Sequence, residues 1–158
     1  MIPVDSGLWA RAGLLRYADP MARHRAWLLG ASLYNLVWGS IAVLAPNLFF
    51  DAAGIGRPNY PGIWQVVGLF VLLYAPAYAV AALAPSTGRL LVAIGFAGKL
   101  AGPIGFSIGY ANGSLPWQFL FVILTNDLIW WPLFVAYFRD SHRLARSWWG
   151  AFVNLPEP

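Results

Sequence analysis

Charged residues divide the chain into long stretches that carry almost no charge. Residues 26–50 and 58–88 contain no Asp, Glu, Lys or Arg, and residues 90–138 contain only Lys99 and Asp127. A helix that spans the hydrocarbon core of a bilayer needs about 20 predominantly apolar residues. The pattern therefore predicts four spanning helices, over residues 26–49, 62–84, 89–111 and 116–138. The sequence Ala-Asn-Gly-Ser-Leu-Pro at 111–116 provides the turn that separates the last two helices.

The composition supports this assignment and excludes the main alternatives. Of the 158 residues, 59% are hydrophobic and 10% are charged, and the mean hydropathy is +0.61. Soluble globular domains carry about 25% charged residues, and disordered chains need the opposite composition. We therefore predict an all-α protein, a transmembrane four-helix bundle in contact with the lipid bilayer. The net charge of +4 does not indicate a nucleic-acid partner, because the basic residues lie at the predicted helix ends.

The distribution of basic residues predicts how the bundle is oriented. Only Arg57 lies on one side of the membrane, and eight basic residues lie on the other: Arg11, Arg16, Arg23, Arg25, Arg89, Arg139, Arg143 and Arg146. Loops rich in Lys and Arg stay in the cytoplasm. We therefore expect a multi-pass protein of the cell (inner) membrane with both termini cytoplasmic.

The two ends of the chain, residues 1–25 and 139–158, are predicted to be cytoplasmic or interfacial. Residues 6–19 and 141–152 combine apolar and basic positions that suit short interfacial helices at both ends of the bundle. Such helices either anchor the chain to the membrane surface or recruit a partner. The segment from Asp140 to Arg143 is expected to be a solvated helix end.

Polar residues recur at one depth of the predicted bundle. Lys99 and Asp127 each lie 14 residues from Gly113, so an antiparallel hairpin places both at the same level, near the bilayer midplane. Asn35 and Tyr74 lie at similar depth in the first two helices, and Asn126 adjoins Asp127. A charge there is costly unless it is paired or neutralised. The five residues are therefore candidates for a ligand or ion site, with a structural Lys99–Asp127 ion pair as the alternative.

Glycine and proline mark the third predicted helix. Gly95, Gly98, Gly102, Gly105 and Gly109 follow one another at spacings of three and four residues. Such a face allows close helix packing within the bundle or in a homodimer, or forms a flat wall against a ring or acyl chain. Pro103 cannot donate a hydrogen bond to the carbonyl of Lys99, and this frees a polar group beside the ammonium. Pro76 and Pro132 do the same to the carbonyls of Leu72 and Leu128, so we expect three of the four helices to break near or below their centre.

The motifs of common enzymes are missing from the sequence. There is no cysteine, no phosphate-binding loop and no nucleophile elbow, and the two histidines, His24 and His142, fall at the predicted cytoplasmic boundary. The lone midplane Asp offers no carboxylate pair for acid–base catalysis. We therefore expect no catalytic residue, no metal and no cofactor, and a non-catalytic role is favoured over a membrane enzyme acting on a quinone, sterol or lipid.

Three segments resemble the DoxX-like group of small four-helix bacterial membrane proteins over residues 15–140. They are Leu-Arg-Tyr at 15–17, Gly-Lys-Leu-Ala-Gly at 98–102 and Asn-Asp-Leu-Ile-Trp-Trp-Pro at 126–132. Some proteins of that group are accessory subunits of quinol-oxidising or other redox complexes. The resemblance therefore implies a non-catalytic accessory or scaffold subunit of a membrane complex. The alternative is a binding or transport protein for a lipophilic or anionic ligand, with Lys99 as the anion contact.

Overall fold

The computed structural model describes residues 19–145 and Phe152, and these residues form helices and loops without strands. The elements are η1 (Ala22–His24), α2 (Arg25–Leu44), α3 (Leu48–Ala53), α4 (Pro61–Leu83), α5 (Arg89–Ala111), α6 (Phe119–Asn126), η2 (Leu128–Trp130) and α7 (Trp131–Ala145). Four stretches are long and apolar enough to cross a membrane: Ala22–Leu44, Pro61–Leu83, Arg89–Ala111 and Phe119–Ala145. The all-α prediction is confirmed. The interfacial helices expected at 6–19 and 141–152 fall largely outside the described residues.

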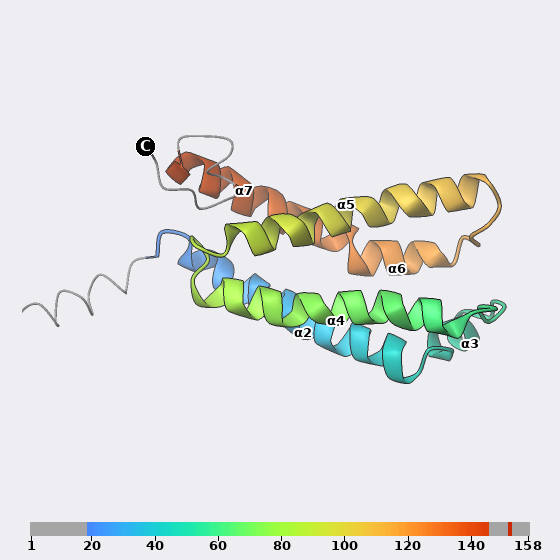
Figure 1. Ribbon diagram of the computed structural model, residues 1–158. Coiled ribbons are helices and arrows are strands. Elements are labelled where there is room, and N and C mark those ends of the chain that lie inside the picture. The colour runs from blue at the N-terminus through green and yellow to red at the C-terminus, as the bar shows by residue number, and fades with distance from the viewer. Residues whose placement is uncertain (1–18, 146–151, 153–158) are drawn as a thin grey trace, which may run out of the picture.

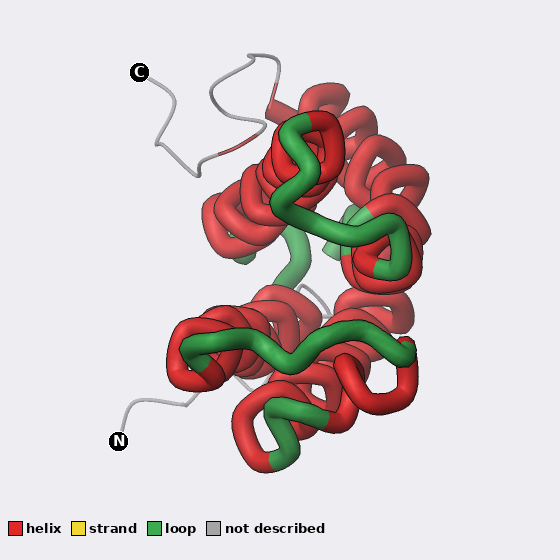
Figure 2. The backbone as a smooth tube through the Cα atoms, turned by 90° about the vertical axis from the view of Figure 1, so that its right-hand side faces the viewer, coloured by secondary structure: helices red, strands yellow, loops and turns green. Residues whose placement is uncertain are grey.

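Two helix hairpins lie side by side. Helices α2 and α4 form one hairpin, and α5 pairs with the α6–α7 segment to form the other (Figure 1). Seen from the end that carries α3 and the 112–118 turn, the two hairpins form two separate layers (Figure 2). We call this the distal end, and we call the opposite end, which carries Arg23, Arg25 and Arg89, the basic end.

The first spanning helix is shorter than the predicted range of 26–49. It ends at Leu44, where Ala45 leaves the helical conformation (φ −132°, ψ 62°) immediately before Pro46. Proline disfavours a helical conformation in the residue before it and supplies no N–H of its own. The chain resumes as the short helix α3, which ends at Gly54 with a positive φ of 65°, a conformation that glycine adopts without strain.

The fourth predicted helix, 116–138, is not continuous. It breaks at Asp127, passes through the single turn η2 and continues as α7 to Ala145. Pro132 has no N–H to donate to the carbonyl of Leu128, and the N–H of Trp131 bonds to that carbonyl instead. The indole of Trp130 donates to the carbonyl of Thr125 at 3.1 Å. Side-chain and 3₁₀ hydrogen bonds thus satisfy the backbone at the break.

Glycines allow close packing within the first hairpin. A Cβ atom built on Gly39 would lie 2.8 Å from the backbone nitrogen of Leu72, and one built on Gly68 would lie 2.7 Å from the Cβ of Ala42. Only glycine permits backbones to approach this closely. Helices α2 and α4 therefore touch through residues that the sequence analysis did not single out.

The packed core lies at the basic end. Its fully buried aromatic residues are Tyr78, Phe134 and Tyr137. Phe134 lies between Trp27 and Phe96, with ring centroids 5.2 and 5.1 Å away. The hydroxyl of Tyr137 donates to the carbonyl of Pro85, which ties the second hairpin to the 84–88 loop. These contacts join the two hairpins at the basic end.

An exposed ion pair closes the loop at the distal end. The guanidinium of Arg57 donates two hydrogen bonds to the carboxylate of Asp51, at 2.7 and 2.8 Å. This bidentate contact holds the pKa of Asp51 below its usual value. Because both groups are exposed, the pair contributes little to stability.

Candidate functional site

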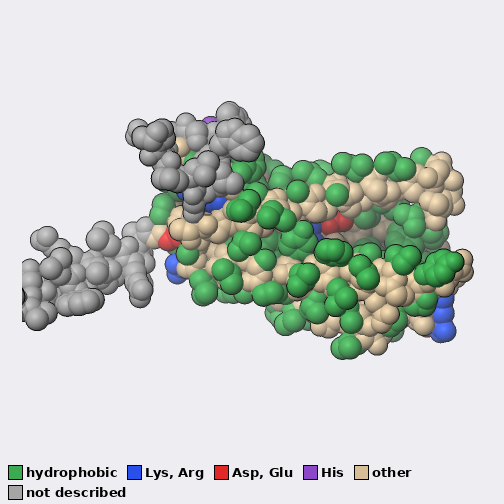
Figure 3. All heavy atoms as spheres, viewed as in Figure 1, with side chains coloured by type: hydrophobic (Ala, Val, Ile, Leu, Met, Phe, Trp, Pro, Cys, Tyr) green, Lys and Arg blue, Asp and Glu red, His purple; other side chains and the backbone are tan. Residues whose placement is uncertain are grey.

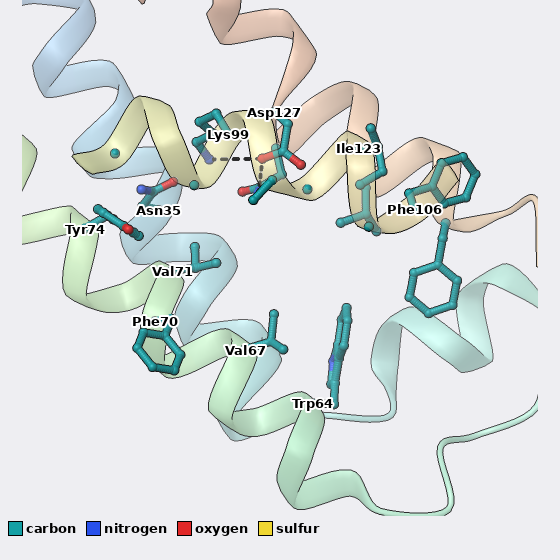
Figure 4. Close-up of a pocket in the computed structure, with 18 of the residues that line it drawn as sticks. Asn35, Trp64, Val67, Phe70, Val71, Tyr74, Lys99, Phe106, Ile123 and Asp127 are labelled. Carbon is teal, nitrogen blue, oxygen red and sulfur yellow. Dashed lines mark hydrogen bonds and ion pairs between the residues drawn. The ribbon is translucent and has the colours of Figure 1, made fainter. Parts of the chain in front are cut away.

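A cavity of about 470 Å³ separates the two hairpins on the distal side of the core. Its lining residues come from α2, α4, α5, the 112–118 turn and the α6–η2 segment. Figure 4 shows Asn35 and Tyr74 near Lys99 and Asp127 at one end, whereas Trp64 and Phe106 line the other. In the space-filling view, acidic side-chain atoms are visible in a hollow between α5 and α4 (Figure 3). The cavity thus has a polar end, which we call the polar floor, and apolar walls.

The polar floor contains Lys99 and Asp127, the two charged residues of the stretch 90–138. The Lys99 ammonium lies 3.7 Å from Oδ1 of Asp127, and their side chains are only 7% and 5% exposed. The amide of Asn126 donates to the same carboxylate oxygen at 2.9 Å. The structure therefore brings Lys99, Asp127 and Asn126 together. The Lys99–Asp127 separation is longer than the usual 2.7–2.9 Å of a charge-assisted hydrogen bond.

The break in the fourth span and Pro103 in the third lie next to this ion pair. Asp127 is the first residue after α6, and its carboxylate occupies the space that a side chain on Gly102 would take. Pro103 leaves the carbonyl of Lys99 without its α-helical partner, and the indole of Trp131 donates to that carbonyl at 3.2 Å. The backbone oxygen freed by Pro103 therefore fastens α5 to α7.

Two side-chain atoms at the polar floor lack partners. The amide nitrogen of Asn35 and the amide oxygen of Asn126 are buried and make no hydrogen bond. Asn35 is 1% exposed and lines the cavity. A buried polar group without a partner costs about 1–3 kcal/mol. One unused donor and one unused acceptor thus lie at the same end of the cavity.

The glycines of α5 accommodate side chains and form part of the cavity wall. Gly95 lies against Tyr78, Gly98 against Tyr74, and Gly109 against Leu115, whereas a Cβ on Gly105 would meet nothing within 4 Å. Gly95, Gly98, Gly102 and Gly105 all line the cavity. The nearest atoms to these glycines belong to side chains, whereas the close backbone contact of α2 with α4 is made at Gly39 and Gly68. Whether the stripe also serves a homodimer remains a prediction.

The cavity continues toward the distal end. A second hollow of about 1050 Å³ is lined by the 55–60 loop, the start of α4 and the 114–116 turn. It shares Trp64, Val67, Leu115 and Phe119 with the first cavity. These four residues lie at the boundary between the two hollows, where the rings of Trp64 and Phe119 contact each other with centroids 6.0 Å apart.

Sequence analysis missed a polar cluster at the basic end. Asp140 is 7% exposed and accepts hydrogen bonds from Arg23 and, at 2.8 Å, from His24. The indole of Trp27 donates to Nδ1 of His24 at 2.9 Å, so the proton shared with Asp140 lies on Nε2. The expectation of a solvated helix end at 140–143 is therefore wrong for Asp140. The i, i+3 spacing of His24 and Trp27 was the only local signal, and Asp140 lies 116 residues away from His24.

Among the described residues, no three His, Asp or Glu side chains gather in a way that could hold a metal ion. No family model, curated protein or solved structure matches this chain. The chain is a polytopic membrane protein with four candidate spans, and its cavity is the feature from which a function can be inferred.

Proposed function

We propose that the protein binds a small amphiphilic molecule between its two hairpins. The single observation that carries this proposal is the cavity with a polar floor and apolar walls. Ligand sites are typically concave, mostly apolar and about 300–1,000 Å³ in volume, with a few placed polar groups. A ligand of this kind would set its polar group beside Lys99, Asp127 and Asn35 and its apolar part along α4 and α5.

The unused hydrogen-bonding atoms favour a binding site over a purely structural ion pair. An ion pair that only locks two helices in register is best served by close packing and by complete hydrogen bonding. Here the Asn35 amide nitrogen and the Asn126 amide oxygen have no partner, and the ammonium of Lys99 is 3.7 Å from its counter-ion. A ligand with polar atoms satisfies these groups.

The test fills the cavity at Gly105, where a larger side chain meets no neighbour. We expect wild-type protein in lipid discs to retain lipid-sized adducts in native mass spectrometry under activation that strips loosely held lipid. The G105L variant should lose them because the leucine occupies the cavity. The matched control is G30L, at an exposed position of α2 where a Cβ also meets nothing. Equal adducts in all three proteins, or none in wild type, would contradict the proposal.

The accessory-subunit hypothesis, which the resemblance to DoxX-like proteins supports, predicts a different occupant. A helix of a partner protein would lie against the open part of α5 near Gly105. In that case the same spectra would show a protein partner bound to wild type and to G30L, but not to G105L. That outcome would replace ligand binding by complex assembly.

We also propose that the basic end faces the cytoplasm, so that the cavity opens toward the outer side. The support is the positive-inside rule, since among the described arginines only Arg57 lies at the distal end. Single cysteines replacing Ser6 and Asn154 should be protected from an impermeant thiol reagent in intact cells, and one replacing Asn59 should react. Reaction at position 6 with protection at position 59 would reverse the orientation.

A further inference from the structure

The charges at the polar floor cancel each other. Lys99 and Asp127 are the only charged residues among those that line the cavity. Their side chains face each other across 3.7 Å, so the floor carries no net charge when both are ionised. A charged head group would enter the interior of the membrane-spanning bundle without a counter-ion of its own, which is costly. Charge balance therefore favours an uncharged ligand over the anionic one that Lys99 alone would suggest.

The unpaired hydrogen-bonding atoms of the floor also favour an uncharged ligand. Besides the ammonium of Lys99, the floor has an amide nitrogen without a partner, on Asn35, and an amide oxygen without a partner, on Asn126. A carboxylate can only accept hydrogen bonds and an ammonium can only donate them, whereas a hydroxyl does both. A hydroxyl-bearing head group therefore suits a floor that has both unpaired donors and an unpaired acceptor.

The apolar walls of the cavity indicate that the rest of the ligand is apolar. From the floor toward the distal end, the cavity is lined by apolar side chains, among them Phe70, Val67, Trp64 and Phe119. The glycines at 102 and 105 leave the α5 wall free of bulk beyond the carboxylate of Asp127. An acyl chain or ring fits along this wall, with its end toward Trp64 and Phe119.

We infer that the ligand is an uncharged amphiphile, with a hydroxyl-bearing head at the polar floor and an apolar tail directed toward the distal end. This inference rests on the proposed function, because it assigns the chemical class of the molecule in the same cavity. It excludes fatty-acid anions and alkylammonium ions as the preferred ligands.

Three probes with the same tail and different head charge test the inference. They are 1-monodecanoylglycerol, decanoate and decylamine, each titrated at neutral pH into the protein in lipid discs. We expect the monoacylglycerol to bind at least about tenfold more tightly than either ion, a difference of about 1.4 kcal/mol. Binding is measured as adduct occupancy by native mass spectrometry and as a shift in thermal unfolding. G105L should bind none of the three, and G30L should match wild type.

Charge variants should change the order of preference. In D127N the floor carries one positive charge, and decanoate should become the tightest-binding probe. In N35D, which keeps the shape of the side chain and the ion pair, the floor carries one negative charge, and decylamine should become the tightest. The second variant preserves the test if D127N does not fold.

The outcomes separate this inference from the proposed function. If wild type binds decanoate or decylamine most tightly and G105L abolishes that binding, the uncharged-ligand inference is overturned while ligand binding stands. If wild type binds no probe, or G105L binds all of them as wild type does, the cavity is not a ligand site and both proposals fail.

Discussion

The basic half and the distal half of the bundle are built from the same four spans but are packed differently. At the basic end, large aromatic side chains join the hairpins, and Tyr78, Phe134 and Tyr137 have no exposed surface. At the distal end, Phe70 is 61% exposed, and the hairpins are separated by a cavity. The Lys99–Asp127 pair lies where the two halves meet.

The comparison indicates that the basic half supplies most of the close packing between the hairpins, whereas the distal half contains the candidate binding site. In a bilayer, apolar side chains gain little by leaving lipid for protein, so close packing and hydrogen bonds hold helices together. The basic half has both, since Tyr137 bonds to Pro85 and Phe134 is enclosed by rings. In the distal half, close backbone packing occurs within the first hairpin, at Gly39 and Gly68. Between the hairpins, Phe119 of α6 contacts Phe49 and Trp64, with ring centroids 5.3 and 6.0 Å apart. The cavity lies between this aromatic contact and the core at the basic end.

The largest expected effect is at the boundary between the halves. Replacing one partner of the buried pair, in K99M or D127N, leaves a buried charge uncompensated and should cost about 3–5 kcal/mol of stability. The double variant should recover most of this loss, because neither neutral group then needs a counter-ion. Thermal unfolding of the four proteins in detergent measures the effect.

Ligand binding by the double variant distinguishes a structural pair from a functional one. If the pair only locks the helices, the double variant is stable and still binds the amphiphile. If it is part of the site, the double variant is stable and binds it weakly. Single variants as stable as wild type would show that the two residues do not depend on each other.

A smaller change in stability is expected when one aromatic residue from each half is replaced by alanine. F134A removes a ring from the enclosed core and should destabilise the protein by about 3 kcal/mol. F70A removes a largely exposed ring and should change stability by less than about 0.5 kcal/mol. Unfolding of both variants under the same conditions measures the contrast. Similar losses would mean that the distal half is packed as firmly as the basic half.

The sequence was informative about depth and weak about helix continuity. Equal spacing from Gly113 placed Lys99 and Asp127 at one level, and the structure pairs them at 3.7 Å. The prolines predict breaks in three helices, and the structure shows one of them, near Pro132, where the fourth span is interrupted at Asp127 and η2. Helices α4 and α5 run on through Pro76 and Pro103. Prolines are frequent in membrane helices, and only some of them interrupt the helix.

Periodic patterns along one helix do not identify the helices that contact it in the fold. Five glycines on one face of α5 suggested close packing of that helix, yet the close backbone contact is made by isolated glycines on α2 and α4. Likewise, Asp140 resembled a surface residue until folding brought Arg23 and His24 to it. Contacts between residues that are far apart in sequence leave no periodic trace.

Hydropathy and charge alone thus determine that this chain is all-α, that it has four spans, and that two opposite charges lie at one depth. These properties follow from the cost of placing unpaired backbone and charge in lipid, which acts on each segment separately. Tertiary structure decides that the hairpins pack closely at the basic end and enclose a cavity between that core and the Phe119 ring contacts of the distal end, because this depends on which side chains interlock. The cavity and the orphaned amides of Asn35 and Asn126 exist only through that arrangement.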